Sequence, residues 1–177
     1  MATSRQGEPL VTIDLDALTL RSGEAARLDV KIRPEPPVSG GVQLAIAEDP
    51  VAARVDISRT TSGFALRLRA EATIAGTCAR CLDPAEQPIT VDAREVDHLT
   101  AEDLELRSPY VSEGVLAVDA WLHDVITLEA PDQLHCRPDC QGLCEECGAN
   151  LNRFAPGEHD HGPKLDPRFA KLRELSE

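Results

Sequence analysis

Aromatic side chains and basic residues are scarce in this sequence, and each shortage narrows what the protein can be. Aromatic residues make up 3% of the 177 residues, so the core has to be built from valine, leucine, isoleucine and alanine. The chain has 31 acidic residues against 18 lysines and arginines, a formal net charge of −13. Because affinity for nucleic acid comes from Lys and Arg meeting phosphates, we do not expect a chain this acidic to coat RNA.

Long apolar runs and the usual catalytic motifs are also missing. No run approaches the length of a membrane-spanning helix, and the opening stretch MATSRQGEPLVTIDLDAL lacks the apolar core of a signal peptide. We therefore expect a cytoplasmic protein, away from membranes, whose thiols stay reduced. The sequence contains no nucleophile elbow, no phosphate-binding glycine loop and no H-E-x-x-H, and this predicts a protein that is not an enzyme.

Alternating apolar and polar residues dominate the chain up to about residue 118, which is typical of half-buried strands. The clearest example is FALRLRAEATIAG, in which one face carries Phe64, Leu66, Leu68, Ala70, Ala72 and Ile74. Arg67 and Arg69 fall on the opposite face, where cross-strand ion pairs are favoured over a small RNA contact. The pattern predicts an antiparallel sheet with one face in water.

Two segments change to helical spacing. VDAWLHDVITLEAPD carries an apolar stripe, with Asp119 as the expected N-cap, Pro131 as the stop and Trp121 as a core anchor. Near the end, LDPRFAKLREL combines Asp166 as a cap with Pro167 at the first helical position.

These patterns predict an α+β fold: a mainly antiparallel β-sheet, one central and one C-terminal helix, and a small cysteine-rich zinc-binding module. Residues 1–131 form the β-rich part, with a C-x-x-C hairpin and the central helix. Residues 132–177 form the cysteine-rich segment and the C-terminal helix. We expect the two parts to make one compact unit.

The six cysteines fall into two groups. Cys78 and Cys81 form a C-x-x-C pair in GTCARCLDP, and HCRPDCQGLCEECGANLN contains Cys136, Cys140, Cys144 and Cys147. In a C-x-x-C knuckle both thiolates point at one ion, and Gly148 in CEECG supplies the positive φ that the turn needs. Disulfides and dithiol redox chemistry are disfavoured by the reducing compartment and by the lack of a βαβ setting. An iron–sulfur cluster at C-x-x-x-C-x-x-C would need a longer, alternating βα chain. Structural zinc is the favoured interpretation.

Two ligand arrangements remain open. In a local site, Cys136, Cys140, Cys144 and Cys147 close around one ion. In a ribbon, Cys78 and Cys81 meet Cys144 and Cys147, which leaves Cys136 and Cys140 to pair with His159 and His161 of HDH. That stretch also fits an exposed polar loop. In either arrangement four protein ligands close the site, which makes it structural, and without metal the polar segment HCRPDCQGLCEECG is expected to be disordered.

Four stretches occur in a recognisable order: CARCLDP, a helix ending in LEAP, DCQGLCEECGANLN, and DPRFAKLREL. This combination resembles the YceD family of large ribosomal RNA subunit accumulation proteins, in its zinc-motif-bearing form. The resemblance implies a non-catalytic role in the synthesis, processing or accumulation of large-subunit ribosomal RNA. It maps the family's cysteines onto all six positions here, with His159 and His161 standing where many relatives have a C-x-C pair.

The resemblance and the acidic charge together indicate a protein partner. We expect a basic ribosomal protein or an rRNA-processing factor of the large subunit, and direct RNA contact stays open. Two alternatives come from other classes. One is a zinc-dependent hydrolase or nuclease built around His159 and His161, and the other is a general protein-interaction adaptor.

Overall fold

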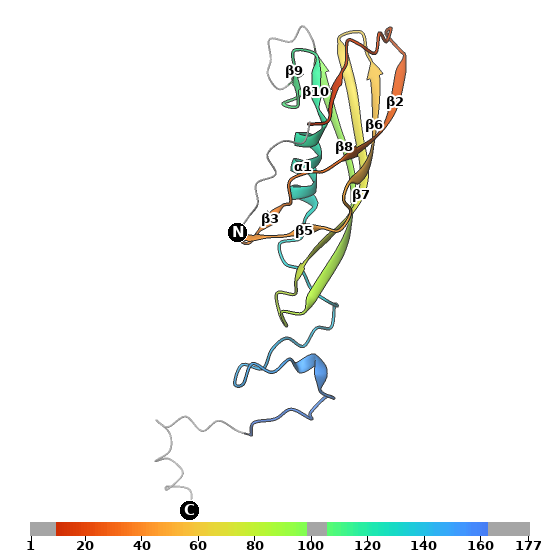
Figure 1. The fold of residues 1–177 in the computed structure, drawn as a ribbon. Helices are drawn as coiled ribbons and strands as arrows, with labels where there is room; N and C mark the ends of the chain where they lie inside the picture. The colour runs from red at the N-terminus through yellow and green to blue at the C-terminus, as the bar shows by residue number, and fades with distance from the viewer. Residues whose placement is uncertain (1–9, 99–105, 163–177) are drawn as a thin grey trace, which may run out of the picture.

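The structure is a computed structural model that describes residues 10–98 and 106–162, and long antiparallel strands dominate it (Figure 1). The strands are β1 (Thr12–Asp14), β2 (Ala25–Ile32), β3 (Val38–Ser39), β4 (Val42–Gln43), β5 (Ala45–Ile46), β6 (Val51–Arg59), β7 (Gly63–Thr77), β8 (Pro84–His98), β9 (Val111–Ser112) and β10 (Val115–Ala117). They are accompanied by the helix α1 (Val118–Glu129) and the short 3-10 turn η2 (Leu151–Arg153).

The main sheet runs in the order β2-β6-β7-β5, and β8 also pairs with β7. β7 and β8 pair antiparallel along their whole length, from Gly63 opposite His98 to Thr77 opposite Pro84. The end of this hairpin therefore extends away from the rest of the sheet toward the cysteine-rich segment, as Figure 1 shows. The first C-x-x-C pair lies in its turn.

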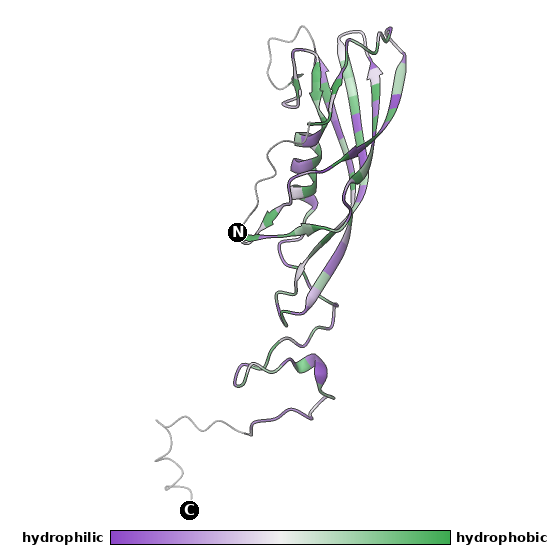
Figure 2. Ribbon diagram, viewed as in Figure 1, coloured by the Kyte–Doolittle hydropathy of each residue, from purple (hydrophilic) through white to green (hydrophobic). Residues whose placement is uncertain are grey.

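The alternation in β7 confirms the predicted wet and dry faces. Phe64, Leu66, Leu68, Ala70, Ala72 and Ile74 are all buried in the core. On the other face, Arg67 binds the Asp92 carboxylate with two hydrogen bonds of 2.6 and 2.7 Å, and Arg69 pairs with Asp56. The cross-strand ion pairs expected for these two arginines are present. Figure 2 shows the alternation as hydrophilic and hydrophobic bands along the strands.

Helix α1 packs against β8 and completes the core. Trp121 is 1% exposed and stacks on Tyr110 with ring centroids 5.9 Å apart, so its predicted role as a core anchor is confirmed. The expected N-cap is wrong: the helix begins after Ala117 without a side-chain cap, and the Asp119 carboxylate instead accepts a hydrogen bond from the Val11 N–H. Asp119 thereby ties the N-terminal strand region to the helix. No helix in the described ranges has the length and apolar character needed to cross a membrane.

The predicted fold class has to be corrected. An α+β fold with a central and a C-terminal helix was expected, whereas residues 10–98 and 106–162 are mostly antiparallel sheet with one α-helix and the η2 turn. The physical reason is that most of the buried apolar residues lie on strands, where they alternate with polar residues and favour extended backbone. The C-terminal helix expected around Asp166 and Pro167 lies outside the described residues.

Candidate metal centres

Two short loops of this chain share one backbone conformation. In the first, which joins β7 to β8, the Leu82 N–H donates to the Cys78 carbonyl at 3.0 Å and the Cys78 N–H donates to the Asp83 carbonyl at 2.8 Å. In the second, the Gly148 N–H donates to the Cys144 carbonyl at 2.9 Å and the Cys144 N–H donates to the Ala149 carbonyl at 2.8 Å. The fifth residue has positive φ in both loops, +63° at Leu82 and +71° at Gly148. CARCL therefore forms the same knuckle as CEECG, although leucine replaces the glycine.

The first group of possible ligands, called site one below, consists of Cys78, Cys81, Cys136 and Cys140. It joins the hairpin turn to the segment that follows α1. The Sγ atoms of Cys78 and Cys140 are 3.8 Å apart, and those of Cys81 and Cys136 are 3.6 Å apart. Cys78, Cys81 and Cys140 are buried and Cys136 is partly exposed. Four thiols thus converge in an almost dry environment, and they could hold a metal ion.

The pKa values of the four thiols of site one are shifted in opposite directions. Burial opposes ionisation of Cys78, but backbone N–H donors from Cys136, Cys81 and Arg80 outweigh it and lower the Cys78 pKa to about 6. The Asn152 side chain lowers the pKa of Cys140. Burial and the neighbouring thiols raise the Cys136 pKa to about 12, and burial raises that of Cys81. The surroundings favour two thiolates, while four together need a cation to offset their repulsion.

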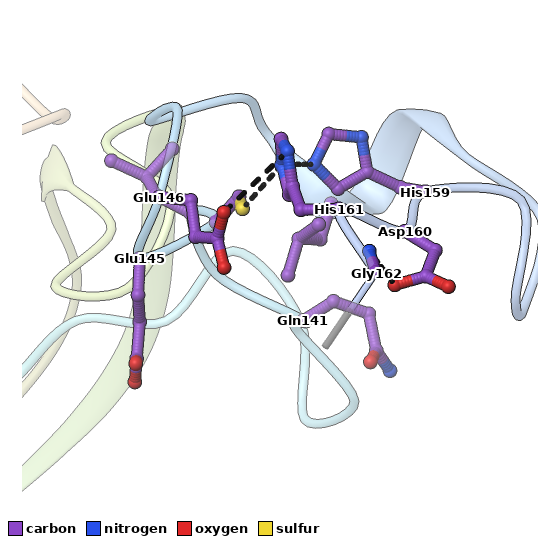
Figure 3. Close-up of a pocket in the computed structure, with 10 residues that line it drawn as sticks. Gln141, Glu145, Glu146, His159, Asp160, His161 and Gly162 are labelled. Atoms are coloured by element: carbon purple, nitrogen blue, oxygen red, sulfur yellow. Dashed lines mark hydrogen bonds and ion pairs between the residues drawn. The ribbon is translucent and has the colours of Figure 1, made fainter. Parts of the chain in front are cut away.

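The second group, called site two below, consists of Cys144, Cys147, His159 and His161. Cys144 Sγ lies 3.3 Å from His161 Nε2, and Cys147 Sγ lies 3.4 Å from His159 Nε2. Figure 3 shows both imidazoles turned toward the same space, with Glu146 beside them. The Glu146 carboxylate is 3.7 Å from His161 Nδ1, on the ring nitrogen that faces away from the thiol. This resembles the outer carboxylate that commonly orients a metal-bound histidine.

Site two differs from site one in exposure and in donor type. Cys147 and His161 are exposed, and every ligand comes from residues 144–161. Backbone N–H donors of Cys147 and Glu146 lower the pKa of Cys144 to about 6, so a thiolate is favoured there before any ion binds. The site is built within one local segment.

The structure brings all six predicted cysteines and both histidines together, in groups that differ from either arrangement derived from the sequence. The local site of Cys136, Cys140, Cys144 and Cys147 does not form, because its members divide between the two groups. The ribbon does not form as expected either, because its two cysteine pairs have changed places. Cys78 and Cys81 meet Cys136 and Cys140 instead of Cys144 and Cys147, and the histidines meet Cys144 and Cys147.

Sequence reasoning missed two polar residues that surround site one. Asp83 accepts a hydrogen bond from Asn150 Nδ2 at 2.6 Å, and Asn152 Nδ2 donates to Cys140 Sγ at 3.4 Å. The available signal was that each follows a C-x-x-C knuckle closely, in CLDP and in CGANLN. Their importance comes from contacts between these distant segments, which spacing along the chain does not encode.

Fold and site together define a mainly antiparallel β protein with two four-residue groups of metal-ligand type. One group is shared between the β7–β8 turn and the segment after α1, and the other lies wholly in the C-terminal segment. The chain belongs to the YceD family, because the family model described as "Large ribosomal RNA subunit accumulation protein YceD" matches residues 66–176. The match begins within β7 and includes β8, α1 and both groups.

Curated relatives extend the similarity to nearly the whole chain. Uncharacterized proteins of Mycobacterium tuberculosis and Mycobacterium bovis are each 30% identical over 175 residues, which covers 93% of this chain and 81% of theirs. An uncharacterized protein of Mycobacterium leprae is 30% identical over 105 residues, 55% of this chain and 46% of its own. No solved structure matches.

Proposed function

We propose that this protein is a non-catalytic factor in the synthesis, processing or accumulation of large-subunit ribosomal RNA, whose C-terminal segment is shaped by two structural zinc ions. The observation that carries the proposal is the assembly of two complete four-donor groups in a chain of the YceD family. The family supplies the biological process, and the donor groups supply the physical role of the segment.

Zinc is favoured by the donors and by their spacing. Thiolate and imidazole are its usual ligands in structural sites, at about 2.3 Å for sulfur and about 2.0–2.1 Å for nitrogen. A tetrahedron with such bonds places two sulfurs about 3.8 Å apart and a sulfur about 3.6 Å from a nitrogen. The sulfur pairs of site one, at 3.8 and 3.6 Å, match this spacing. The sulfur–nitrogen pairs of site two, at 3.3 and 3.4 Å, are slightly shorter.

The non-catalytic part of the proposal follows from ligand number. Four protein donors fill a tetrahedral zinc ion and leave no position for water or substrate. The competing hydrolase or nuclease would need one donor of site two to leave, and its exposed members Cys147 and His161 make that site the one to test. Incubation of the zinc-loaded protein with precursor rRNA separates the two: we expect no cleavage, whereas cleavage abolished by His161→Ala would establish the enzyme.

The proposed partner is a basic ribosomal protein or an rRNA-processing factor of the large subunit, met in the cytoplasm. Residues 132–162 contain six acidic residues and two arginines, and α1 contains three acidic residues and no lysine or arginine. Such a surface steers a basic protein toward it and disfavours bare RNA. A general adaptor unrelated to the ribosome would instead capture partners from other processes.

Depletion of the protein tests the biological part. We expect reduced large-subunit rRNA, an altered subunit profile in sucrose gradients, and recovery of large-subunit proteins or processing factors by affinity purification at low salt. A normal subunit profile after complete depletion contradicts the proposal. The metal part is tested by native mass spectrometry, with two zinc ions expected per chain.

A further inference from the structure

The turn Asn150–Asn152, called the bridging turn below, lies in the sequence between ligands of site two, but its side chains contact residues at site one. It lies between Cys147 and His159, which are ligands of site two. The side chains at its two ends nevertheless reach residues of site one and its immediate support. The position of this turn therefore depends on both sites.

Asn152 makes the most direct connection. Its Nδ2 donates to the Sγ of Cys140 at 3.4 Å, and its Oδ1 accepts from the Gln141 N–H and from Arg137 Nη2, each at 2.8 Å. The amide thus stabilises negative charge on one ligand sulfur and fixes the backbone next to that ligand. A further bond, from Asn152 Nδ2 to Asn150 Oδ1 at 2.8 Å, ties the two ends of the bridging turn together.

Asn150 connects the turn to the other half of site one. Its Nδ2 donates to the Asp83 carboxylate at 2.6 Å, and the Asp83 backbone carbonyl accepts from the Cys78 N–H at 2.8 Å. The Leu151 N–H also donates to the Gly142 carbonyl at 2.9 Å. The bridging turn therefore contacts both chain segments that supply the ligands of site one, the β7–β8 turn and the segment after α1.

Burial contributes little to holding the bridging turn itself. None of residues 143–162 is buried, so this segment gains little from the hydrophobic effect. Two ligands of site two flank the turn, Cys147 before it and His159 after it. An ion bound by Cys147 and His159 would fix the chain on either side of the turn and reduce the conformational freedom of the turn.

From these contacts we propose that the two metal sites load cooperatively, with Asn152 as the positioning residue that carries the coupling. This inference rests on the metal binding proposed above. An ion at site two orders the bridging turn, the ordered turn presents the Asn152 amide to Cys140, and site one then binds its ion more tightly. Since coupling between sites is reciprocal, an ion at site one must tighten site two by the same factor.

Cobalt titration of the full-length, reduced, metal-free protein in competition with a chelator measures both affinities. Co²⁺ bound to four sulfurs and Co²⁺ bound to two sulfurs and two nitrogens differ in their visible absorption, so each site is followed separately. In the double variant His159→Ala/His161→Ala, we expect site one to bind Co²⁺ about tenfold more weakly, although none of its ligands has changed.

Asn152→Ala should lower the Co²⁺ affinity of site one by a similar factor of about ten. Adding His159→Ala/His161→Ala to this variant should lower that affinity little further, because the coupling between the sites is already lost. The matched control is Gln133→Ala, which removes an exposed amide with no hydrogen bond in the described part of the chain and should leave both affinities unchanged. Strictly multiplicative effects of Asn152→Ala and the histidine pair overturn the proposal, as does unchanged site one affinity in the histidine variant.

A reciprocal measurement guards against a misfolded Asn152→Ala variant. Cys78→Ser/Cys140→Ser disables site one, and site two should then weaken by the same factor as in the first experiment; an unchanged site two overturns the coupling. The outcomes also separate the two proposals. A wild-type protein that binds no metal at either group removes the proposed zinc role, whereas two ions bound with independent affinities remove only the cooperativity.

Discussion

The Sγ atoms of Cys78 and Cys140 lie 3.8 Å apart, although 62 residues separate them in the sequence. The first sits in the turn of the β7–β8 hairpin and the second in the segment after α1. A shared ion would therefore join a rigid part of the sheet to a chain that has few apolar residues of its own. Site two, by contrast, closes a loop of only local residues.

Substitution of Cys140 and of Cys147 should have different consequences. Cys140→Ser leaves a buried site with three sulfurs, so we expect native mass spectrometry to show one ion fewer and hydrogen exchange to rise across residues 132–143. Cys147→Ser also removes one ion, but its site is exposed and local, so exchange across residues 132–143 should change little. Equal loss of protection across residues 132–143 in both variants would contradict this division of roles.

Removal of metal should separate the sheet from the C-terminal segment. The sheet and α1 bury a continuous aliphatic core that includes Leu68, Ile74, Leu122 and Ile126, whereas residues 143–162 have no buried member. With a strong chelator under reducing conditions, we expect amide protection to persist in β6, β7 and β8 and to disappear across residues 143–162. Global loss of protection at the same chelator concentration would mean that the core depends on the ions.

The β-sheet was readable from sequence because burial there repeats with period two. Leu66 and Leu68 on one side and Arg67 and Arg69 on the other indicate directly which face of the strand is buried. That the cysteines gather in groups that could hold a metal ion was also readable, since C-x-x-C knuckles are local. The division into ligand groups was not, because it depends on where the hairpin turn meets the later segment. Asp119 shows the same limit of sequence reasoning. Its position is typical of an N-cap, but its carboxylate accepts a hydrogen bond from the distant Val11 N–H.

Leu82 occupies a backbone conformation that favours glycine, and this gives a prediction with a defined sign. Its φ is +63° and the residue is 64% exposed, so the leucine is strained and buries little. The strain of about 1–2 kcal/mol exceeds the entropic disadvantage of glycine, about 0.5–1 kcal/mol. Leu82→Gly should therefore raise the free energy of unfolding by roughly 0.5 kcal/mol in chemical denaturation. Gly148→Leu in the second knuckle should lower metal affinity at site two; a destabilised Leu82→Gly protein would refute the assignment of strain.

Asp56 gives a prediction about pH. Its carboxylate accepts a hydrogen bond from Arg27 Nε at 2.6 Å and pairs with Arg69, and these partners hold its pKa below the ordinary aspartate value. Because the folded pKa is the lower one, ionised Asp56 contributes stability above the unfolded pKa, and this contribution is lost as the pH falls through the folded pKa. Asp56→Asn should cost about 1 kcal/mol or less near pH 7.

The measurement is the difference in unfolding free energy between wild type and Asp56→Asn, taken from pH 7 to about pH 3. Loss of metal in acid affects both proteins alike, so it cancels in this difference, which should shrink toward zero as the pH falls. The matched control is Asp29→Asn, whose partner Arg54 lies in the same face but whose side chain is 71% exposed. Its effect should stay within about 0.5 kcal/mol at every pH. A difference for Asp56→Asn that grows in acid would show that its carboxylate destabilises the sheet.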